Sequence, residues 1–211
     1  MNARDLSLPL VAILRGLQPA EVQPLGRVLF DAGFRMLEVP LNRPGALECI
    51  AALRAIAPAG SLVGGGTMLS VADVENVHAA GGQLMVAPNC DPAVIRRAAD
   101  LGLWCAPGIA TPTEAFMALR SGAHALKIFP ADMVGFEGLV ALQSVLPQHT
   151  PLWPVGGITP DSLAPWRHAG ATGFGIGSQL YQPGVSAQAL SARARVFGEA
   201  WQIAARGEAL G

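Results

Sequence analysis

The chain has 211 residues, of which 51% are hydrophobic and 14% are charged, and its formal net charge is -1. This length and composition predict one domain over residues 1–211 with a large apolar core. The net charge near zero lacks the excess of positive charge that is typical of nucleic-acid-binding proteins. The sequence also contains no run of about 18 apolar residues, the length needed to cross a bilayer, so we expect neither nucleic acid nor membrane as a partner. Three cysteines without metal-type spacing predict reduced thiols in a cytoplasmic protein: Cys49, Cys90 and Cys105.

Short apolar runs of strand length alternate with longer stretches of helical period, and the alternation repeats eight times. The expected strands cover residues 10–15, 36–40, 62–67, 84–87, 104–108, 125–129, 152–155 and 173–176. The expected helices cover residues 20–32, 46–57, 71–80, 93–101, 113–121, 136–145 and 186–205. Capping residues or first-turn prolines precede several of them, at Ser70, Asp91, Thr111 and Thr159, and left-handed stops are expected at Gly33, Gly81, Gly102, Gly122 and Gly170.

Eight strand-then-helix units in a chain of this length indicate an α/β fold, the closed parallel (β/α)8 TIM barrel. An open doubly wound sheet is the alternative. That fold usually has a glycine-rich phosphate-binding turn near its start, and Gly64-Gly65-Gly66 lacks the further glycine that the dinucleotide-binding fingerprint requires. The barrel is therefore favoured.

Lys127 is the only lysine of the chain, because thirteen of the fourteen cationic residues are arginine. It stands between Leu126 and Ile128 in an expected strand. Arginine stays protonated in proteins, whereas a desolvated lysine can lose its proton and act as a nucleophile. The alternative is a bias toward arginine that leaves one surface lysine without a role.

The alternation of side chains along a strand places Lys127 and Phe129 on one face and Leu126 and Ile128 on the other. We expect the aliphatic pair to pack under helices and Lys127 to point into the barrel. The same alternation turns Glu38 inward from its own strand. A buried amine beside a buried acid suits a Schiff-base nucleophile with a general acid/base, while the alternative is a structural ion pair without chemistry.

The active site of a barrel lies at the C-terminal ends of its strands, so the residues there are candidate substrate ligands. They are Arg15, Thr67, Pro88, Phe129, Val155, Gly156, Gly157, Gly177 and Ser178. The small residues after the last two strands suit phosphate binding by backbone N–H groups, and Arg15 suits a carboxylate or a phosphate. Thr67 could bind a substrate carboxylate or cap the next helix. The alternative for the glycines is a turn that binds no ligand, and the alternative for Arg15 is a salt bridge at the rim of the barrel.

Metal and hydrolase chemistry are poorly supported. The four histidines show no paired ligand spacing and are typical of surface or packing positions: His78, His124, His149 and His168. No Gly-x-Ser-x-Gly nucleophile elbow is present.

Five motifs occur in a recognisable order: LEVPLN at 37–42, GGGT at 64–67, VAP at 86–88, LKIFPA at 126–131 and PVGGI at 154–158. With them, the chain resembles the class I pyruvate aldolases of 2-keto-3-deoxy-6-phosphosugar acids over about residues 8–182. The resemblance implies a Schiff base on Lys127, proton transfer by Glu38, and contacts of Arg15 and Thr67 with the anionic ends of a phosphorylated keto-acid. It also implies a homotrimer, no metal or organic cofactor, and phosphate binding by Gly156, Gly157, Gly177 and Ser178.

Members of this family divide two epimeric substrates, the gluconate and the galactonate derivatives. The gluconate enzymes typically carry arginine where this chain has Asn42 and threonine where it has Val155, and the loss of that hydroxyl near substrate C4 favours galactonate. The segment at 13–16 also resembles the galactonate branch. Arg43 could reach back to replace the missing arginine, so a gluconate-specific or dual-epimer aldolase stays an alternative.

We therefore expect a carbon–carbon lyase that cleaves the galactonate derivative to pyruvate and glyceraldehyde 3-phosphate. Two other classes stay open. A phosphosugar isomerase or decarboxylase barrel shares the phosphate loops without forming an imine. A non-catalytic barrel binds its ligand without needing pyruvate.

Overall fold

The computed structural model describes residues 7–207. Its strands are β1 (Leu10–Ile13), β2 (Met36–Pro40), β3 (Leu62–Gly66), β4 (Leu84–Val86), β5 (Trp104–Ala106), β6 (Gly108–Ile109), β7 (Leu126–Ile128), β8 (Leu152–Pro154) and β9 (Phe174–Ile176). Its α-helices are α1 (Val22–Asp31), α2 (Ala46–Ile56), α3 (Val71–Ala79), α4 (Pro92–Asp100), α5 (Pro112–Arg120), α6 (Ala131–Val145), α7 (Leu163–His168) and α8 (Ala187–Arg206). Short 3-10 helices at Pro19–Glu21 and Pro160–Ser162 precede α1 and α7.

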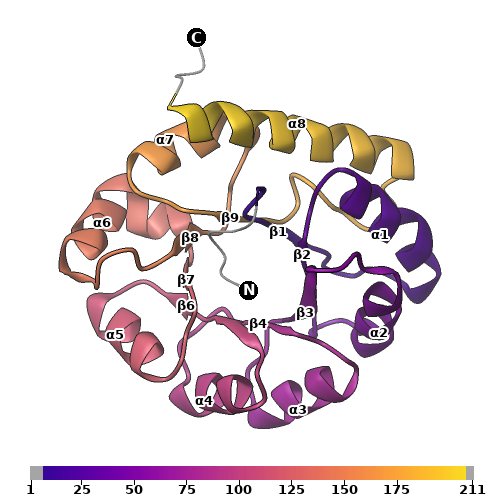
Figure 1. Cartoon of the computed structure of the whole chain (residues 1–211), viewed down its shortest axis with the longest axis horizontal. Helices are drawn as coiled ribbons and strands as arrows, with labels where there is room; N and C mark the ends of the chain where they lie inside the picture. The colour runs from indigo at the N-terminus through magenta and orange to yellow at the C-terminus, as the bar shows by residue number, and fades with distance from the viewer. Residues whose placement is uncertain (1–6, 208–211) are drawn as a thin grey trace.

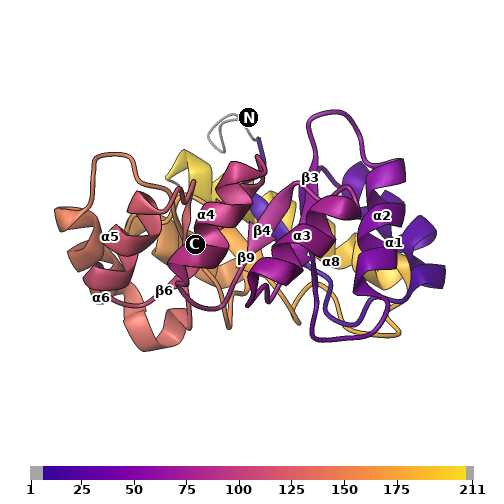
Figure 2. The ribbon, with the colours of Figure 1, turned by 90° about the horizontal axis from the view of Figure 1, so that it is seen from below.

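The strands form a closed parallel barrel. Six of them pair in the order β5-β4-β3-β2-β1-β9, and three pair in the order β6-β7-β8. A bridge between Val155 and Gly175 joins the β8 side to β9, and β5 continues into β6. Figure 1 shows the helices arranged around this ring in chain order, and Figure 2 shows them flanking the strands from the side. The predicted (β/α)8 fold is confirmed, and the open doubly wound sheet is wrong.

The expected fifth strand at 104–108 is two short strands, because Pro107 interrupts it. Residues before Pro107 pair with β4, whereas Gly108 and Ile109 after it pair with β7. Proline has no N–H to donate to a ladder. Its carbonyl instead accepts the backbone N–H of Lys127 at 2.9 Å. The barrel wall therefore changes partners directly beside the lysine.

Most expected helices are confirmed, with ends within two residues of the expected ones. Side chains of Ser70, Asp91, Thr111 and Thr159 accept backbone N–H groups at the starts of four helices, and the five expected stop glycines all have positive φ. The helix expected at 136–145 matches the part of α6 that follows Gly135, which has φ 69° and ψ 175° and interrupts the helical geometry. The turn before this glycine, from Ala131, was not expected from the sequence. No helix within residues 7–207 is long and apolar enough to cross a bilayer.

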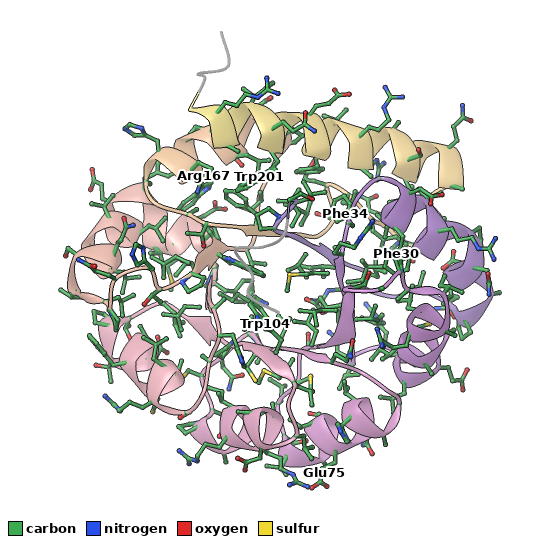
Figure 3. All side chains as sticks on the ribbon, in the orientation of Figure 1. Phe30, Phe34, Glu75, Trp104, Arg167 and Trp201 are labelled. Atoms are coloured by element: carbon green, nitrogen blue, oxygen red, sulfur yellow. The ribbon has the colours of Figure 1, made fainter. Side chains whose placement is uncertain are left out.

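Apolar side chains pack on both sides of the strands. The larger cluster lies between strands and helices, and a smaller one fills the barrel interior with Val11, Met36, Leu84, Val86, Trp104, Ala106, Ala125 and Trp153. Trp104 lies inside the ring of strands (Figure 3), and its ring centroid is 5.0 Å from that of Trp153. Met36 and Ala125 precede Glu38 and Lys127 by two residues, so strand alternation turns the acid and the amine into the same interior.

Candidate active site

Lys127 is a buried amine on the inner wall of the barrel. It lies in β7 with 7% of its surface exposed, and its Nζ atom is 4.6 Å from the centroid of the Phe129 ring. Burial lowers the pKa of Lys127, the charge of Glu38 raises it, and the charge of Arg15 lowers it. Because burial is the largest of these effects, a greater share of the amine is neutral and nucleophilic than in an exposed lysine.

Glu38 is a buried carboxyl group in β2. It lies between Ile13 of β1 and Gly64 of β3, its partners in the two ladders. Only 2% of its surface is exposed, and its Oε2 atom has no hydrogen-bond partner among residues 7–207. Burial, opposed by the charges of Lys127 and Arg15, raises the pKa of Glu38 from 4.5 to about 7. A carboxyl group with this pKa can both donate and accept a proton at neutral pH.

The amine and the carboxyl group influence each other without touching. Each shifts the pKa of the other by its charge. Both lie in the described part of the chain, and no ion pair of 4.0 Å or less joins them. The direct structural ion pair that was the alternative from sequence is therefore not formed. Neither Lys127 nor Glu38 is neutralised by contact with the other, which leaves both able to act on a bound molecule.

Arg15 follows β1 at the mouth of the barrel. Its Nη1 atom donates a hydrogen bond of 2.8 Å to Oδ1 of Asn42, which follows β2. Its charge reaches both Glu38 and Lys127, since it lowers the pKa of each. Sequence reasoning noted Asn42 only as a departure from the gluconate pattern and missed its contact with Arg15. Strand-end proximity in a parallel barrel is the signal that could have found it.

Thr67 directly follows β3 and has a φ of 55°. A β-branched residue is uncommon in this left-handed region, and holding one there costs about 1–3 kcal/mol. The helix that follows is capped by Ser70, whose Oγ accepts the N–H of Asp73 at 3.1 Å. The interpretation of Thr67 as the helix cap is therefore wrong. Strain at the C-terminal end of a barrel strand points instead to a role in the site.

Pro88 and Phe129 differ in what they offer to a ligand. Phe129 lies against the amine of Lys127, and its ring also borders Gly156, where an added Cβ would be 3.9 Å from Cε2. Pro88 is half-buried, and its carbonyl packs so closely on Gly108 that a side chain at 108 would collide with it. Phe129 therefore adjoins the Lys127 amine, whereas Pro88 contributes to the close packing of the barrel wall.

The loops after β8 and β9 lie side by side because Val155 and Gly175 form a bridge. Gly156 and Gly157 have φ values of 105° and 66°, which favour glycine. A Cβ on Gly177 would meet no atom of residues 7–207 within 4 Å, and Ser178 is exposed, so this second loop is open on the described surface. The Asp132 carboxylate lies beside Gly157, 3.0 Å from the position of an added Cβ, and sequence reasoning missed this acid.

The histidines of the described chain do not form part of a metal site. Within residues 7–207, no group of three His, Cys, Asp or Glu side chains could hold a metal ion. His124 stacks on Trp104, and its Nδ1 atom accepts the N–H of Cys105 at 3.1 Å. That histidine has a packing role, as its sequence context indicated.

The family model of the KDPG and KHG aldolases matches residues 2–194. A probable 2-dehydro-3-deoxy-6-phosphogalactonate aldolase of Rhizobium meliloti is 45% identical over 88% of this chain and 88% of its own. The 2-dehydro-3-deoxy-6-phosphogalactonate aldolase of Escherichia coli is 43% identical over 93% of this chain and 96% of its own. A solved structure described as native KDPGal is 42% identical, has a TM-score of 0.92, and covers 95% of this chain and 97% of that one. The chain therefore belongs to the KDPG and KHG aldolase family.

Proposed function

We propose that the chain is a class I aldolase that cleaves 2-dehydro-3-deoxy-6-phosphogalactonate to pyruvate and glyceraldehyde 3-phosphate. The observation that carries this proposal is the sole lysine, buried in the barrel beside a carboxyl group whose pKa burial raises to about 7. The substrate is supported by two relatives that bear this name and align over most of their length.

In the first half of the reaction, the neutral amine of Lys127 adds to the C2 carbonyl carbon of the substrate and gives a carbinolamine. Glu38 in its protonated form donates a proton to the departing hydroxyl, and water leaves as the protonated imine forms. The positive imine nitrogen then serves as the electron sink for bond cleavage. This route requires no metal ion and no organic cofactor.

In the second half, the Glu38 carboxylate takes the proton of the C4 hydroxyl. The C3–C4 bond breaks, its electron pair moves toward the imine nitrogen, and glyceraldehyde 3-phosphate leaves as the aldehyde. Glu38 returns the proton to C3 of the resulting enamine, and water hydrolyses the imine to release pyruvate and free Lys127. A carboxyl group with a pKa near 7 suits both directions of proton transfer.

Six of the remaining candidate residues bind the two anionic ends of the substrate. Arg15 and Thr67 hold the carboxylate end near Lys127, while the loops at 156–157 and 177–178 hold the phosphate through backbone N–H groups. Two features support this division: the charge of Arg15 acts on the reactive pair, and the two loops adjoin across the Val155–Gly175 bridge.

Val155 is the residue we assign to the choice of epimer. It is 8% exposed, and its Cγ2 atom would lie 2.7 Å from a Cβ on Gly175, so its isopropyl group occupies the space that this glycine leaves. Its N–H donates to the carbonyl of Ile128 at 3.0 Å, which holds it one strand away from Lys127. An apolar group here favours the epimer that needs no hydrogen bond at C4.

We expect the wild-type enzyme to have a higher kcat/KM with the galactonate derivative than with the gluconate derivative. Val155→Thr should shift the ratio of the two kcat/KM values toward the gluconate derivative by about tenfold or more, because threonine is close to valine in size but carries a hydroxyl group. Side-by-side kinetics on both epimers measure this. Val155→Ala, which removes volume without adding a hydroxyl, is the control and should lower both values alike. A wild type that prefers gluconate, or accepts both equally, would favour the alternative aldolase.

We also propose that the chain assembles as a homotrimer. Helix α6 leaves Met133, Phe136 and Val140 exposed at 69%, 46% and 52%. Phe136 and Val140 border a groove of about 1050 Å³ between α6, α7 and α8. Such an apolar face is typical of a protein–protein contact.

Light scattering after gel filtration should give three times the chain mass of 21.8 kDa. Val140→Asp should shift the particle toward the mass of one chain, because a charge in an apolar contact is costly. The same change at exposed Val196, on the outer side of α8, should leave the mass unaltered. A wild type with the mass of one chain at micromolar concentration contradicts the proposal.

A further inference from the structure

The three consecutive glycines of β3 have different neighbours. A Cβ on Gly64 would collide with the backbone of Leu84, and one on Gly65 would lie 2.7 Å from Val77 and 2.9 Å from Met68 in the outer core. A Cβ on Gly66 would instead fall on the carboxyl group of Glu38 and leave 2.8 Å to its Oε1 atom. The absence of a side chain at Gly66 therefore creates the space in which this carboxyl group lies.

The position of Glu38 is held by its backbone. Ladders on both sides fix β2, and Gly66 is paired directly with Pro40, two residues beyond the acid. Hydrogen bonds do not hold the carboxyl group in the same way, since its Oε2 atom is buried and has no hydrogen-bond partner in the described part of the chain. The bare backbone of Gly66 is thus the surface against which the carboxyl group rests.

We propose that Gly66 is a positioning residue of the active site: by lacking a side chain, it admits the Glu38 carboxyl group to a water-excluded recess of the barrel facing Lys127. The inference rests on the proposed aldolase function. It assigns the last glycine of the GGGT segment to the placement of the general acid/base, a role separate from both phosphate binding and a turn.

A methyl group at position 66 cannot coexist with the observed carboxyl position. The backbone of Gly66 is not in the left-handed region, so alanine itself is tolerated there and the side chain of Glu38 has to move. Movement toward the barrel mouth exposes the carboxyl group to water, which favours its charged form. Both the rate of proton transfer and the pH at which the acid titrates then change.

The test compares Gly66→Ala with Gly65→Ala, a neighbour on the same strand that packs on the outer face. We expect Gly66→Ala to lower kcat by about 100-fold with little change in KM, and to move the acidic limb of the kcat profile down by about one pH unit or more. Gly65→Ala should keep the wild-type limb even where it lowers the melting temperature. A Gly66→Ala enzyme with the wild-type kcat and limb overturns the proposal.

Two further measurements separate this role from folding and from the aldolase reaction itself. The double variant Gly66→Ala/Glu38→Asp shortens the acid by one methylene and should recover part of the lost kcat; failure of both variants to fold would assign Gly66 a packing role and overturn the proposal. Denaturant unfolding at about pH 5 and about pH 8 needs no substrate, and the pH dependence that Glu38 contributes should shrink in Gly66→Ala alone. If the wild type does not cleave the substrate, the aldolase function is refuted. The pH dependence of unfolding then still tests whether Gly66 positions the Glu38 carboxyl group.

Discussion

Lys127→Arg is expected to abolish aldol cleavage, with a loss of kcat on the order of 10⁴-fold or more. Arginine keeps the charge and much of the length of the side chain, but it stays protonated and forms no imine with a keto-acid. The rate of pyruvate release from the galactonate derivative measures the loss. Because the chain has no other lysine, this variant removes every side-chain amine.

Borohydride reduction in the presence of pyruvate gives a second readout that does not depend on turnover. The wild type should gain the mass of one reduced pyruvate on the peptide that contains Lys127, and the variant should not. The double variant Lys127→Arg/Arg97→Lys is the matched control, since it supplies an exposed amine on α4, in the place of an arginine paired with Glu75 at 2.9 Å. Lys127 has no special reactivity if the double variant gives an adduct in equal yield, or if the wild type gives none. Either result would favour the phosphosugar isomerase or decarboxylase barrel, or the non-catalytic binding barrel, over the aldolase.

The barrel and the inward position of Lys127 and Glu38 were predictable from the sequence because they depend on local rules. Strand alternation alone placed Lys127 and Glu38 on the inner face, and the eightfold repeat supplied the order of the strands. The structure has both residues buried in that interior. Neither prediction required knowledge of a contact between distant side chains.

The details that the sequence did not reveal depend on contacts across strands. The hydrogen bond from Arg15 to Asn42 and the approach of Glu38 to Gly66 join residues that are 27 and 28 positions apart and meet only through the register of neighbouring strands. The strain at Thr67 is likewise invisible in a pattern, because threonine is ordinarily favoured in extended backbone. Local propensity does not predict a backbone conformation that is unfavourable for the residue and is imposed by tertiary structure.

The acid/base assignment leads to a prediction about activity. Glu38→Gln keeps the size of the side chain but can no longer exchange a proton, so we expect kcat to fall by about 10² to 10⁴-fold. In the wild type, the step that takes the proton of the C4 hydroxyl requires the carboxylate, so kcat should fall at acidic pH, and burial, which raises the pKa of Glu38, places this fall closer to neutral pH than for an exposed glutamate. The acidic limb should be absent from the residual activity of Glu38→Gln. Measurement of kcat over pH for both enzymes tests this, and a limb that persists in the variant assigns it to another group.

The same group makes the stability of the fold depend on pH in an unusual direction. The pKa of Glu38 is raised from 4.5 in the unfolded chain to about 7 in the folded one. Between these two pH values the unfolded chain has released the proton while the folded chain retains it, so the folded state binds more protons and its stability falls as the pH rises. Full ionisation of Glu38 should thus lower the free energy of unfolding by roughly 3 kcal/mol relative to acidic pH.

Glu38→Gln has no such proton, so its free energy of unfolding should not show this decrease. The difference in free energy of unfolding between Glu38→Gln and the wild type should therefore shift in favour of the variant by roughly 3 kcal/mol from about pH 5 to about pH 8. Denaturant unfolding at the two pH values measures the difference. Glu114→Gln is the matched control: the pKa of Glu114 is lowered, chiefly by the hydrogen bond from the backbone N–H of Ala110, so its contribution is lost only on acidification and stays constant over this range. Equal pH dependence in the wild type and in Glu38→Gln would show that the carboxyl group is already ionised in the folded barrel at pH 5, and that its proton is not available for the cleavage reaction.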